Sequence, residues 1–330
     1  MRRILFSFAM LFVLTDAATA QCSGTNLIDA LPQQDQVALR AEAALSPHAT
    51  GNFWRAARGT QVVHLIGTYH FDDPRHAATM AALAPVLSDV TTLLVEAGPE
   101  EEAALKARIT REPQLMIIDK GPTLPEMLPR PDWLRLSQAM RDRGIAPFMA
   151  AKFRPWYVTM LLGVPPCDIE RMATTKGLDG MLIDAALAEG VTVRAMEPYD
   201  TLFGIFDQLP QEDQLAMITS ALAMEERSED FSVTLADSYF AEEGRLIWEF
   251  MRHESLSLPN YTPERVAEEF ATMEEALMTS RNRKWIPEIE AAAARGAVLV
   301  AFGALHLAGE HGVLSLLEAQ GFTVERLAIQ

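Results

Sequence analysis

The chain has 330 residues, of which 49% are hydrophobic and 22% charged, and this balance excludes fibrous and intrinsically disordered proteins. Its 28 basic and 45 acidic side chains give a formal net charge of −17, which repels phosphate backbones, so we expect no nucleic-acid partner. The sequence also lacks the glycine-rich motifs that bind dinucleotides or nucleoside triphosphates.

Residues 1–20 have the pattern of a cleavable signal peptide. Two arginines follow Met1, residues 4–14 form an apolar run, and Ala18-Thr19-Ala20 offers small residues for cleavage before Gln21. The run is too short for a permanent membrane span, and we expect no stable membrane span after signal removal. The sequence therefore predicts a periplasmic or secreted protein. A lipoprotein anchored through Cys22 is the alternative, which the large side chain of Gln21 disfavours.

The chain contains two cysteines, Cys22 and Cys167. An exported protein meets oxidising conditions in which two thiols tend to pair, so we expect a disulfide between them. The alternative is a pair of free thiols, one buried and one exposed.

Short apolar runs that end in glycine, proline or a charged residue predict six strands. The runs are Gln61–Ile66, Thr91–Val95, Ile145–Ala150, Val191–Ala195, Ala297–Phe302 and Phe322–Leu327. Between them, apolar residues at three- and four-residue spacing predict helices at Arg75–Leu87, Pro99–Ile109, Leu178–Ala188 and Leu305–Ala319. This alternation predicts an α/β fold with a mostly parallel central sheet that is covered on both faces.

One long stretch, residues 202–295, shows amphipathic helix patterns and no strand pattern. We expect it to be an all-helical insertion that folds over the carboxyl edge of the sheet. The rest of residues 21–330 is expected to form a single α/β domain around it.

Two of the predicted strands lead into the same Gly-x-x-His motif. The motifs are Gly67-Thr68-Tyr69-His70 and Gly303-Ala304-Leu305-His306. Ligand sites of open α/β sheets lie at the carboxyl ends of the strands, so we expect His70 and His306 to share one crevice there. A single motif of this kind is more often structural, but two copies beside strand-end carboxylates favour a shared site.

The carboxylates are Glu96, which follows the strand Thr91–Val95, and Glu197, which follows the strand Val191–Ala195. Asp200 lies three residues further on, and either it or Glu197 completes the site. Two imidazoles and one or two carboxylates are ligands for a divalent transition metal, and they leave positions open for water. Zinc is one candidate for this metal.

These motifs resemble the TraB/GumN family, which is related to the Tiki metalloproteases and more distantly to ChaN-like and erythromycin-esterase-like folds. The resemblance covers most of the chain after residue 20. It rests on both Gly-x-x-His motifs, Glu96, Glu197, Gly177-Leu178-Asp179, Arg281-Asn282 with Trp285, and Gly309 with Gly312-Val313-Leu314. It implies an α/β fold with two Gly-x-x-His halves and a helical insertion. For the Tiki branch it also implies manganese- or cobalt-dependent peptide hydrolysis.

The resemblance also implies roles for individual residues. His70, Glu96 and His306 would form the metal site, with Glu96 counted among the catalytic groups as well. Arg281 and Asn282 would be polarising or positioning groups, and Glu197 is a weaker match for the same catalytic set.

Other residues have two interpretations each. Asp179 either caps a helix or holds a site residue, and Asp73 is expected to cap the helix Arg75–Leu87 rather than join Asp72 or His76 as a metal ligand. Trp156 is a candidate for stacking on a substrate, with core packing as the alternative. Tyr69 is a second candidate for substrate binding.

The sequence and the resemblance together predict a metal-dependent hydrolase that acts on a peptide or small-molecule substrate, with peptide bonds as the favoured target. The alternative is a non-catalytic protein of the same fold that binds haem or a peptide, or an accessory factor for exported polysaccharide or signalling peptides. A hydrolase requires the metal, whereas a binding protein requires only the crevice.

Overall fold

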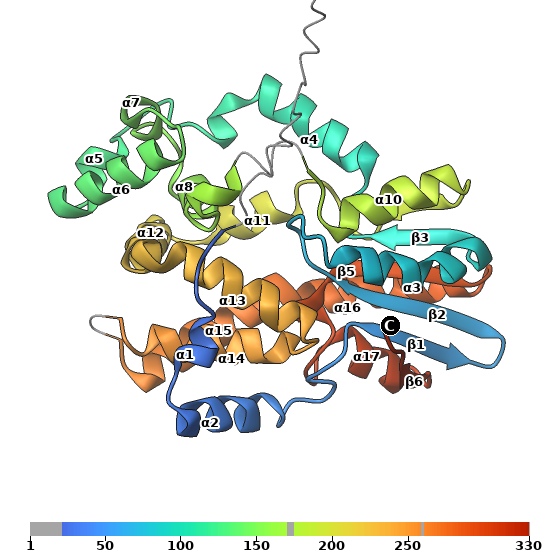
Figure 1. Ribbon diagram of the computed structural model, residues 1–330. Coiled ribbons are helices and arrows are strands. Elements are labelled where there is room, and N and C mark those ends of the chain that lie inside the picture. Colours follow the sequence, from blue (N-terminus) through green and yellow to red (C-terminus); the bar gives the residue numbers. More distant parts are fainter. Residues whose placement is uncertain (1–21, 170–174, 259–260, 330) are drawn as a thin grey trace, which may run out of the picture.

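The computed structural model describes residues 22–169, 175–258 and 261–329, and the predicted signal peptide, residues 1–20, lies outside them. The fold is α/β, with a six-stranded sheet in the order β4-β3-β5-β2-β1-β6 (Figure 1). The strands are β1 (Phe53–Arg58), β2 (Gln61–Thr68), β3 (Thr92–Val95), β4 (Thr192–Ala195), β5 (Val298–Gly303) and β6 (Thr323–Arg326). Neighbours from β4 to β2 are parallel, and β1 pairs antiparallel with both β2 and β6. The predicted, mostly parallel sheet is confirmed.

Strand β1 was not predicted from the sequence. It reads Phe53-Trp54-Arg55-Ala56-Ala57-Arg58 and contains none of the β-branched residues on which the strand predictions relied. A tight turn at Gly59, whose φ is +60°, joins it to β2 as a hairpin. Because β1 separates β2 from β6, it also places the C-terminal strand at one edge of the sheet.

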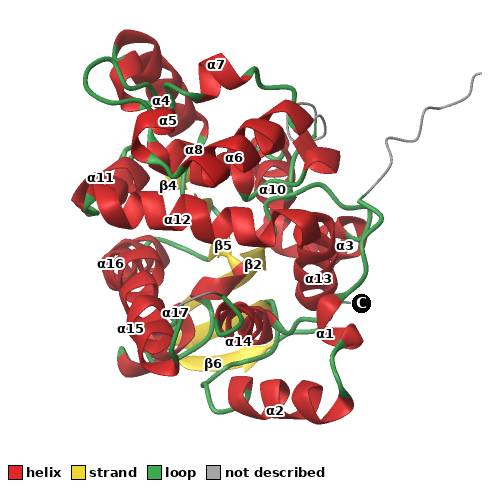
Figure 2. Cartoon of the chain, turned by 90° about the vertical axis from the view of Figure 1, so that its left-hand side faces the viewer, coloured by secondary structure: helices red, strands yellow, loops and turns green. Residues whose placement is uncertain are grey.

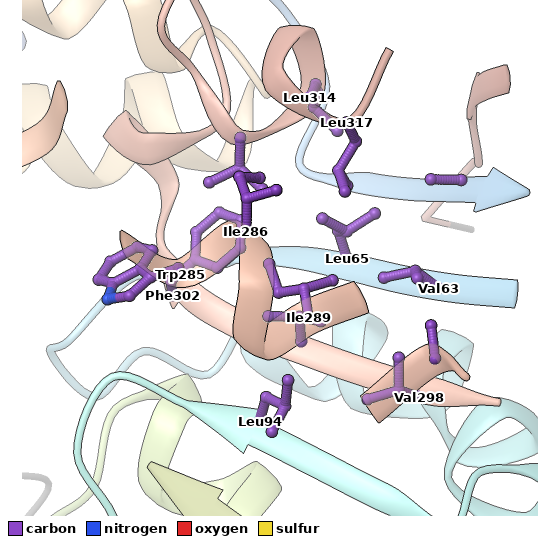
Figure 3. Close-up of a cluster of buried hydrophobic side chains, with 14 of the residues drawn as sticks. Val63, Leu65, Leu94, Trp285, Ile286, Ile289, Val298, Phe302, Leu314 and Leu317 are labelled. Atoms are coloured by element: carbon purple, nitrogen blue, oxygen red, sulfur yellow. The ribbon is translucent and has the colours of Figure 1, made fainter. Parts of the chain in front are cut away.

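Helices cover both faces of the sheet, and the alternation of β5 shows which residues face each layer. Val298, Val300 and Phe302 pack against helices α16 (Ser280–Ala293) and α17 (Val313–Ala319), as the close-up of this cluster shows (Figure 3). Leu299 and Ala301 point to the other face, against α3 (His76–Asp89) and α10 (Leu178–Ala188). Both faces of this central strand are therefore buried, as a continuous apolar run requires.

The predicted helix Leu305–Ala319 is shorter in the structure. A single 3₁₀ turn, Ala304–His306, follows β5, and α17 begins only at Val313. Gly309 interrupts the segment with a φ of +99°, a conformation that an α-helix does not contain. The interruption leaves His306 at the end of the strand instead of inside a long helix.

The all-helical stretch is confirmed, since its described residues form helices and no strand. These are α11 (Thr201–Gln208), α12 (Gln211–Met224), α13 (Ser228–Phe240), α14 (Gly244–Ser255), α15 (Pro263–Glu274) and α16, with a 3₁₀ turn at Glu225–Arg227 and a π-helical turn at Glu275–Thr279. The stretch brings α16 onto one face of the sheet and α13 and α14 close to the other (Figure 1).

The predicted strand Ile145–Ala150 is wrong. These residues contain the short helix α7 (Pro147–Ala150), because Pro147 has no N–H for a β-ladder and fits the first turn of a helix. Helix α7 belongs to a helical lobe at the top of Figure 2, and the apolar cluster of this lobe also includes Ile218 and Leu222 of α12. The lobe contains α4 (Pro99–Arg111), a 3₁₀ turn at Pro113–Leu115, α5 (Leu124–Met127), α6 (Arg130–Asp142), α7 and α8 (Pro155–Leu162).

The described chain begins with α1 (Leu27–Ala30) and α2 (Gln33–Ala43), which pack against α14 and Phe231 of α13. The predicted disulfide is present: Cys22, before α1, is bonded to Cys167, beyond α8. Among the described residues, no helix combines the length and the apolar character that crossing a membrane requires.

Candidate functional site

His70, Glu96 and His306 converge at the carboxyl ends of three adjacent strands, β2, β3 and β5. Gly303, the last residue of β5, lies between them. A Cβ atom on Gly303 would be 3.3 Å from Nε2 of His70, 3.5 Å from Oε1 of Glu96 and 3.8 Å from Cδ2 of His306. The two Gly-x-x-His motifs and the strand-end glutamate thus share one site.

The two motifs are in direct contact, and this contact depends on Gly67. A Cβ atom at this position would lie 2.6 Å from Cδ1 of Leu307 and 2.8 Å from Cα of Ala304, in the turn that carries His306. The backbone oxygen of Gly67 also accepts a hydrogen bond of 2.9 Å from the hydroxyl of buried Tyr239. The first motif is therefore fixed by the second motif and by helix α13.

Asp179 holds His70. It lies in the first turn of α10, where its Oδ2 accepts from Nδ1 of His70 at 2.8 Å and its Oδ1 accepts from the hydroxyl of Thr68 at 2.5 Å. Its side chain does not cap the helix. Desolvation lowers the pKa of His70, but the charge and hydrogen bond of Asp179 outweigh it and raise that pKa to about 9.

His306 is held in a different way, deep beside α16. Its Nδ1 lies 2.6 Å from Oδ1 of Asn282, whose amide nitrogen donates to the carbonyl oxygen of His311 at 2.9 Å. The amide is thereby oriented with its oxygen toward the ring, so Nδ1 of His306 is the donor and Nε2 carries the lone pair. Burial, together with the positive charge of Arg281, lowers the pKa of His306 to about 4, so the ring is neutral near pH 7.

Glu96 is the carboxylate at the centre of the site. Its Oε1 accepts from the backbone N–H of Gly303 at 2.6 Å and lies 4.0 Å from Nε2 of His306, while its Oε2 accepts from Arg281 at 2.5 Å. Burial raises the pKa of Glu96, but the neighbouring positive groups and the Gly303 N–H outweigh that and lower it to about 2. Glu96 is therefore ionised near neutral pH.

Arg281 links the two glutamates. It bonds Glu197 through Nε at 2.9 Å and through Nη2 at 2.6 Å, and the indole nitrogen of Trp285 donates to the same carboxylate at 3.2 Å. Arg281 lies in the first turn of α16, directly after the π-helical turn Glu275–Thr279. Such turns are frequent at functional sites, and here the turn precedes both Arg281 and Asn282.

Other sequence candidates lie elsewhere. Asp200 bonds Arg108 at 2.8 Å, so Glu197 is the carboxylate that the structure brings to the site. Asp73 accepts from the backbone and side chain of Arg75, just before α3, but its side chain does not cap the helix, which begins at His76. His76 is buried, and its Nε2 lies 2.9 Å from the carbonyl oxygen of Phe71.

The two proposed substrate-binding aromatics are not among the site side chains either. Trp156 is 6% exposed and stacks on Phe206 with 5.3 Å between ring centroids, which is core packing between α8 and α11. Tyr69 stacks on Tyr239 and lines a cavity of about 400 Å³ beside Cys22. Contact of either residue with a substrate stays a prediction.

The sequence reasoning missed Thr68 and Tyr239. Thr68 had a signal, since residues 68 and 70 lie on the same side of an extended chain and Thr68 therefore reaches the same carboxylate as His70. Tyr239 had no such signal in the sequence, because its contact with Gly67 spans 172 positions.

Together, the fold and site describe an α/β protein with two imidazoles, two glutamates and an arginine gathered at one edge of a mostly parallel sheet. The sequence profile of the TraB/PrgY/gumN family matches residues 52–326, and the chain belongs to this family. The family resemblance is thereby confirmed, while the relation to the Tiki metalloproteases stays a prediction.

Two curated relatives are similar over most of their length. The chain is 22% identical to the uncharacterized protein YbaP of Escherichia coli strain K12 over 267 residues, which cover 78% of this chain and 89% of YbaP. YbaP of Shigella flexneri gives the same identity and coverage. No solved structure matches the chain.

Proposed function

We propose that this protein is an exported hydrolase of peptide bonds, dependent on a divalent metal ion that His70, Glu96 and His306 hold. One observation carries the proposal. Nδ1 of each histidine is bonded to a fixed side-chain oxygen, from Asp179 or Asn282, so Nε2 is the atom that each ring offers to a metal. Metal-ligating histidines are oriented by partners of this kind.

The charges around the site support a divalent cation. Glu96, Glu197 and Asp179 contribute three negative charges and Arg281 one positive charge, which leaves a net charge of −2 when both imidazoles are neutral. A divalent ion would neutralise this charge. Imidazole and carboxylate ligands suit manganese, cobalt and zinc.

The spacing of the ligand atoms requires one adjustment. The ligand atoms of His70, Glu96 and His306 do not all lie within 4.8 Å of one another. Among the described residues, the one group of three potential ligands that does so is Cys22, Cys167 and Asp168, and both of its sulfurs are bonded in the disulfide. The proposed ligands are therefore further apart than in a loaded site. The His70 side chain is 62% exposed, and metal binding would require it to shift toward Glu96 while it keeps its bond to Asp179.

Each residue has a defined task in this proposal. The metal would lower the pKa of a bound water and polarise the scissile carbonyl. Asp179 and Asn282 orient the two histidines, and the guanidinium of Arg281, held by Glu197, would donate to a carbonyl oxygen once one of its N–H groups is released. Glu197 has both oxygens bonded to Arg281 and Trp285, so it acts through Arg281.

Export to the periplasm or medium is part of the proposal. It is supported by the signal-peptide pattern of residues 1–20 and by the disulfide between Cys22 and Cys167. The same disulfide argues against the lipoprotein alternative, because the sulfur of Cys22 cannot form a thioether to a lipid at the same time.

Metal content and peptidase activity test the proposal together. Protein purified without added metal is analysed for metals, and its activity on a peptide library is measured with manganese, cobalt or zinc. His306→Ala should abolish both metal binding and hydrolysis. His253→Ala, in the last turn of α14, is the matched control and should leave both intact. If the unaltered protein binds none of these metals, a non-catalytic ligand-binding protein takes the place of the hydrolase.

A further inference from the structure

All five N–H groups of the Arg281 guanidinium have an acceptor, although the side chain is only 8% exposed. A guanidinium has five N–H donors and no acceptor, so this is complete pairing. The five acceptors are Oε1 and Oε2 of Glu197, Oε2 of Glu96, the carbonyl oxygen of Leu277 and Nε2 of His306.

The bond to His306 differs from the other four. Its acceptor is an imidazole nitrogen, and the 3.3 Å contact between Nη1 and Nε2 uses the only lone pair of that nitrogen. The other ring nitrogen is already committed to Asn282 as a donor. Nε2 of His306 therefore accepts a hydrogen from Arg281 or binds a metal ion, but not both.

We propose that Arg281 and the metal ion compete for Nε2 of His306. When the metal binds, the Nη1–H group of Arg281 loses His306 as its acceptor and donates instead to the carbonyl oxygen of the substrate. This inference rests on the proposed function. Arg281 then couples metal binding to substrate binding, because it can bind the substrate carbonyl only after His306 has given its lone pair to the metal. A charged N–H in so buried a place is costly to leave without an acceptor, and this cost favours the new bond.

Glu197 and Trp285 keep the guanidinium in place when that bond changes. The carboxylate of Glu197 is bonded by both Nε and Nη2, which fixes the plane of the guanidinium. The indole N–H of Trp285 donates to Oε2 of the same carboxylate, which also accepts from Nε of Arg281. Nη1, which also donates to the carbonyl oxygen of Leu277, therefore stays beside His306 instead of swinging toward solvent.

Two substitutions separate competition for the lone pair from simple charge repulsion. Arg281→Lys keeps the positive charge, but its single nitrogen cannot serve all five acceptors, whereas Arg281→Met removes the charge as well. Arg194→Met is the matched control. Arg194 lies on β4 and bonds Glu288, which is on the same helix as Arg281, and it has no bond to His306. Metal affinity is measured by calorimetric titration with manganese and with zinc.

We expect Arg281→Lys to bind metal about three- to tenfold more tightly than the unaltered protein, since one hydrogen bond no longer has to be broken. Its kcat/KM on peptides should nevertheless fall, because the carbonyl donor is lost. Arg281→Met should show at least the same gain in affinity, and Arg194→Met should change affinity less than twofold. Circular dichroism verifies that each variant is folded.

Nitrogen-15 NMR of labelled histidines supplies a readout that needs no activity. In the metal-free protein, the Nε2 resonance of His306 should move in Arg281→Lys and stay in Arg194→Met. Equal metal affinity of Arg281→Lys and the unaltered protein, or a resonance that does not move, would overturn the competition. If the unaltered protein binds metal in that case, the proposed function stands and only this inference fails. If it binds no metal, both fail.

Discussion

His70 and His306 occupy equivalent positions in their motifs, yet their surroundings move their pKa values in opposite directions. The pKa of His70 rises to about 9 because Asp179 outweighs desolvation, whereas burial beside Arg281 lowers the pKa of His306 to about 4. Near pH 7 the metal-free site therefore holds one protonated and one neutral imidazole. The first has to lose its proton before it binds a metal, so metal affinity should rise with pH up to about 9.

Replacing Asp179 tests this interpretation directly. In Asp179→Asn, the pKa of His70 should fall from about 9 toward its ordinary value, because the charge that raises it is gone. The raised pKa also contributes stability that is complete below pH 6.5 and is lost as the pH rises through about 9, and this loss should disappear in the variant. NMR titration and unfolding at several pH values measure the two effects.

Asp184→Asn is the control for that experiment, since Asp184 lies on the same helix and bonds the exposed Lys176. It removes one carboxylate without touching His70. An unchanged His70 titration in Asp179→Asn would show that another group sets its pKa.

Gly303 supplies the second test at the scale of a residue. Its φ is −50°, so alanine fits the backbone, but the new methyl group would lie among His70, Glu96 and His306. Gly303→Ala should therefore lower metal affinity by at least tenfold while the protein stays folded. Gly244→Ala, whose Cβ would meet the neighbouring Ala304 at ordinary distances of 3.7 and 4.0 Å, should bind metal normally. Undiminished binding by Gly303→Ala would place the metal elsewhere.

At the scale of elements, the sequence predicted the parts of the fold that depend on local pattern. β2, β3, β4, β5 and β6 agree with the predicted runs to within two residues at each end. The wrong strand, Ile145–Ala150, has an apolar composition that suits a buried helix as well as a strand, and only Pro147 distinguished the two. β1 was missed because its strand character comes from pairing with β2 and β6 rather than from its own residues.

The site, too, was predictable only where it depends on local sequence pattern. His70, Glu96 and His306 were identified because each follows a strand directly, and parallel strands bring such residues to one edge. Of the hydrogen-bond partners that orient these motifs, Asp179 and Tyr239 lie more than a hundred positions from His70 and Gly67. Asn282 lies within the insertion, 24 positions before His306. The sequence offered Asp179 and Asn282 as candidates but did not show which histidine each one holds. No local pattern in one sequence specifies those distances.

Contact between the two motifs gives a prediction at this scale. Gly67→Ala would place its Cβ within 3.0 Å of three atoms of Ala304 and Leu307, so the two turns would have to separate. We expect a loss of about 1–3 kcal/mol in the free energy of unfolding, as for other overpacked interiors, together with weaker metal binding. Urea unfolding and metal titration measure the two effects.

Gly204→Ala is the matched control, because Gly204 is a helical glycine of α11 with nothing within 4 Å of its new Cβ. It should gain about 0.5–1 kcal/mol from the higher helix propensity of alanine. A Gly67→Ala protein as stable as this control would contradict the tight contact between the motifs.

At the scale of the whole molecule, the disulfide joins two segments that are far apart in the sequence. Cys22 precedes α1, whose segment bonds α13 through Thr25 to Asp230 and Leu27 to Thr234, and Cys167 lies beyond the helical lobe. Beside the disulfide, Asp168 accepts from the hydroxyl of Ser232 on α13 at 3.0 Å. The N-terminal segment, the lobe and α13 are thus connected at one place.

Removing this disulfide should destabilise the protein by about 2–5 kcal/mol, because the bond closes a loop between positions 145 apart and so restricts the unfolded chain. Urea unfolding of the Cys22→Ser/Cys167→Ser double variant measures the loss. The unaltered protein in dithiothreitol should lose the same amount, which excludes an effect of the serines themselves. Mass spectrometry of unreduced peptides should show Cys22 linked to Cys167. Alkylation of both cysteines without prior reduction would contradict the bond, and with it the strongest structural support for an oxidising, exported setting.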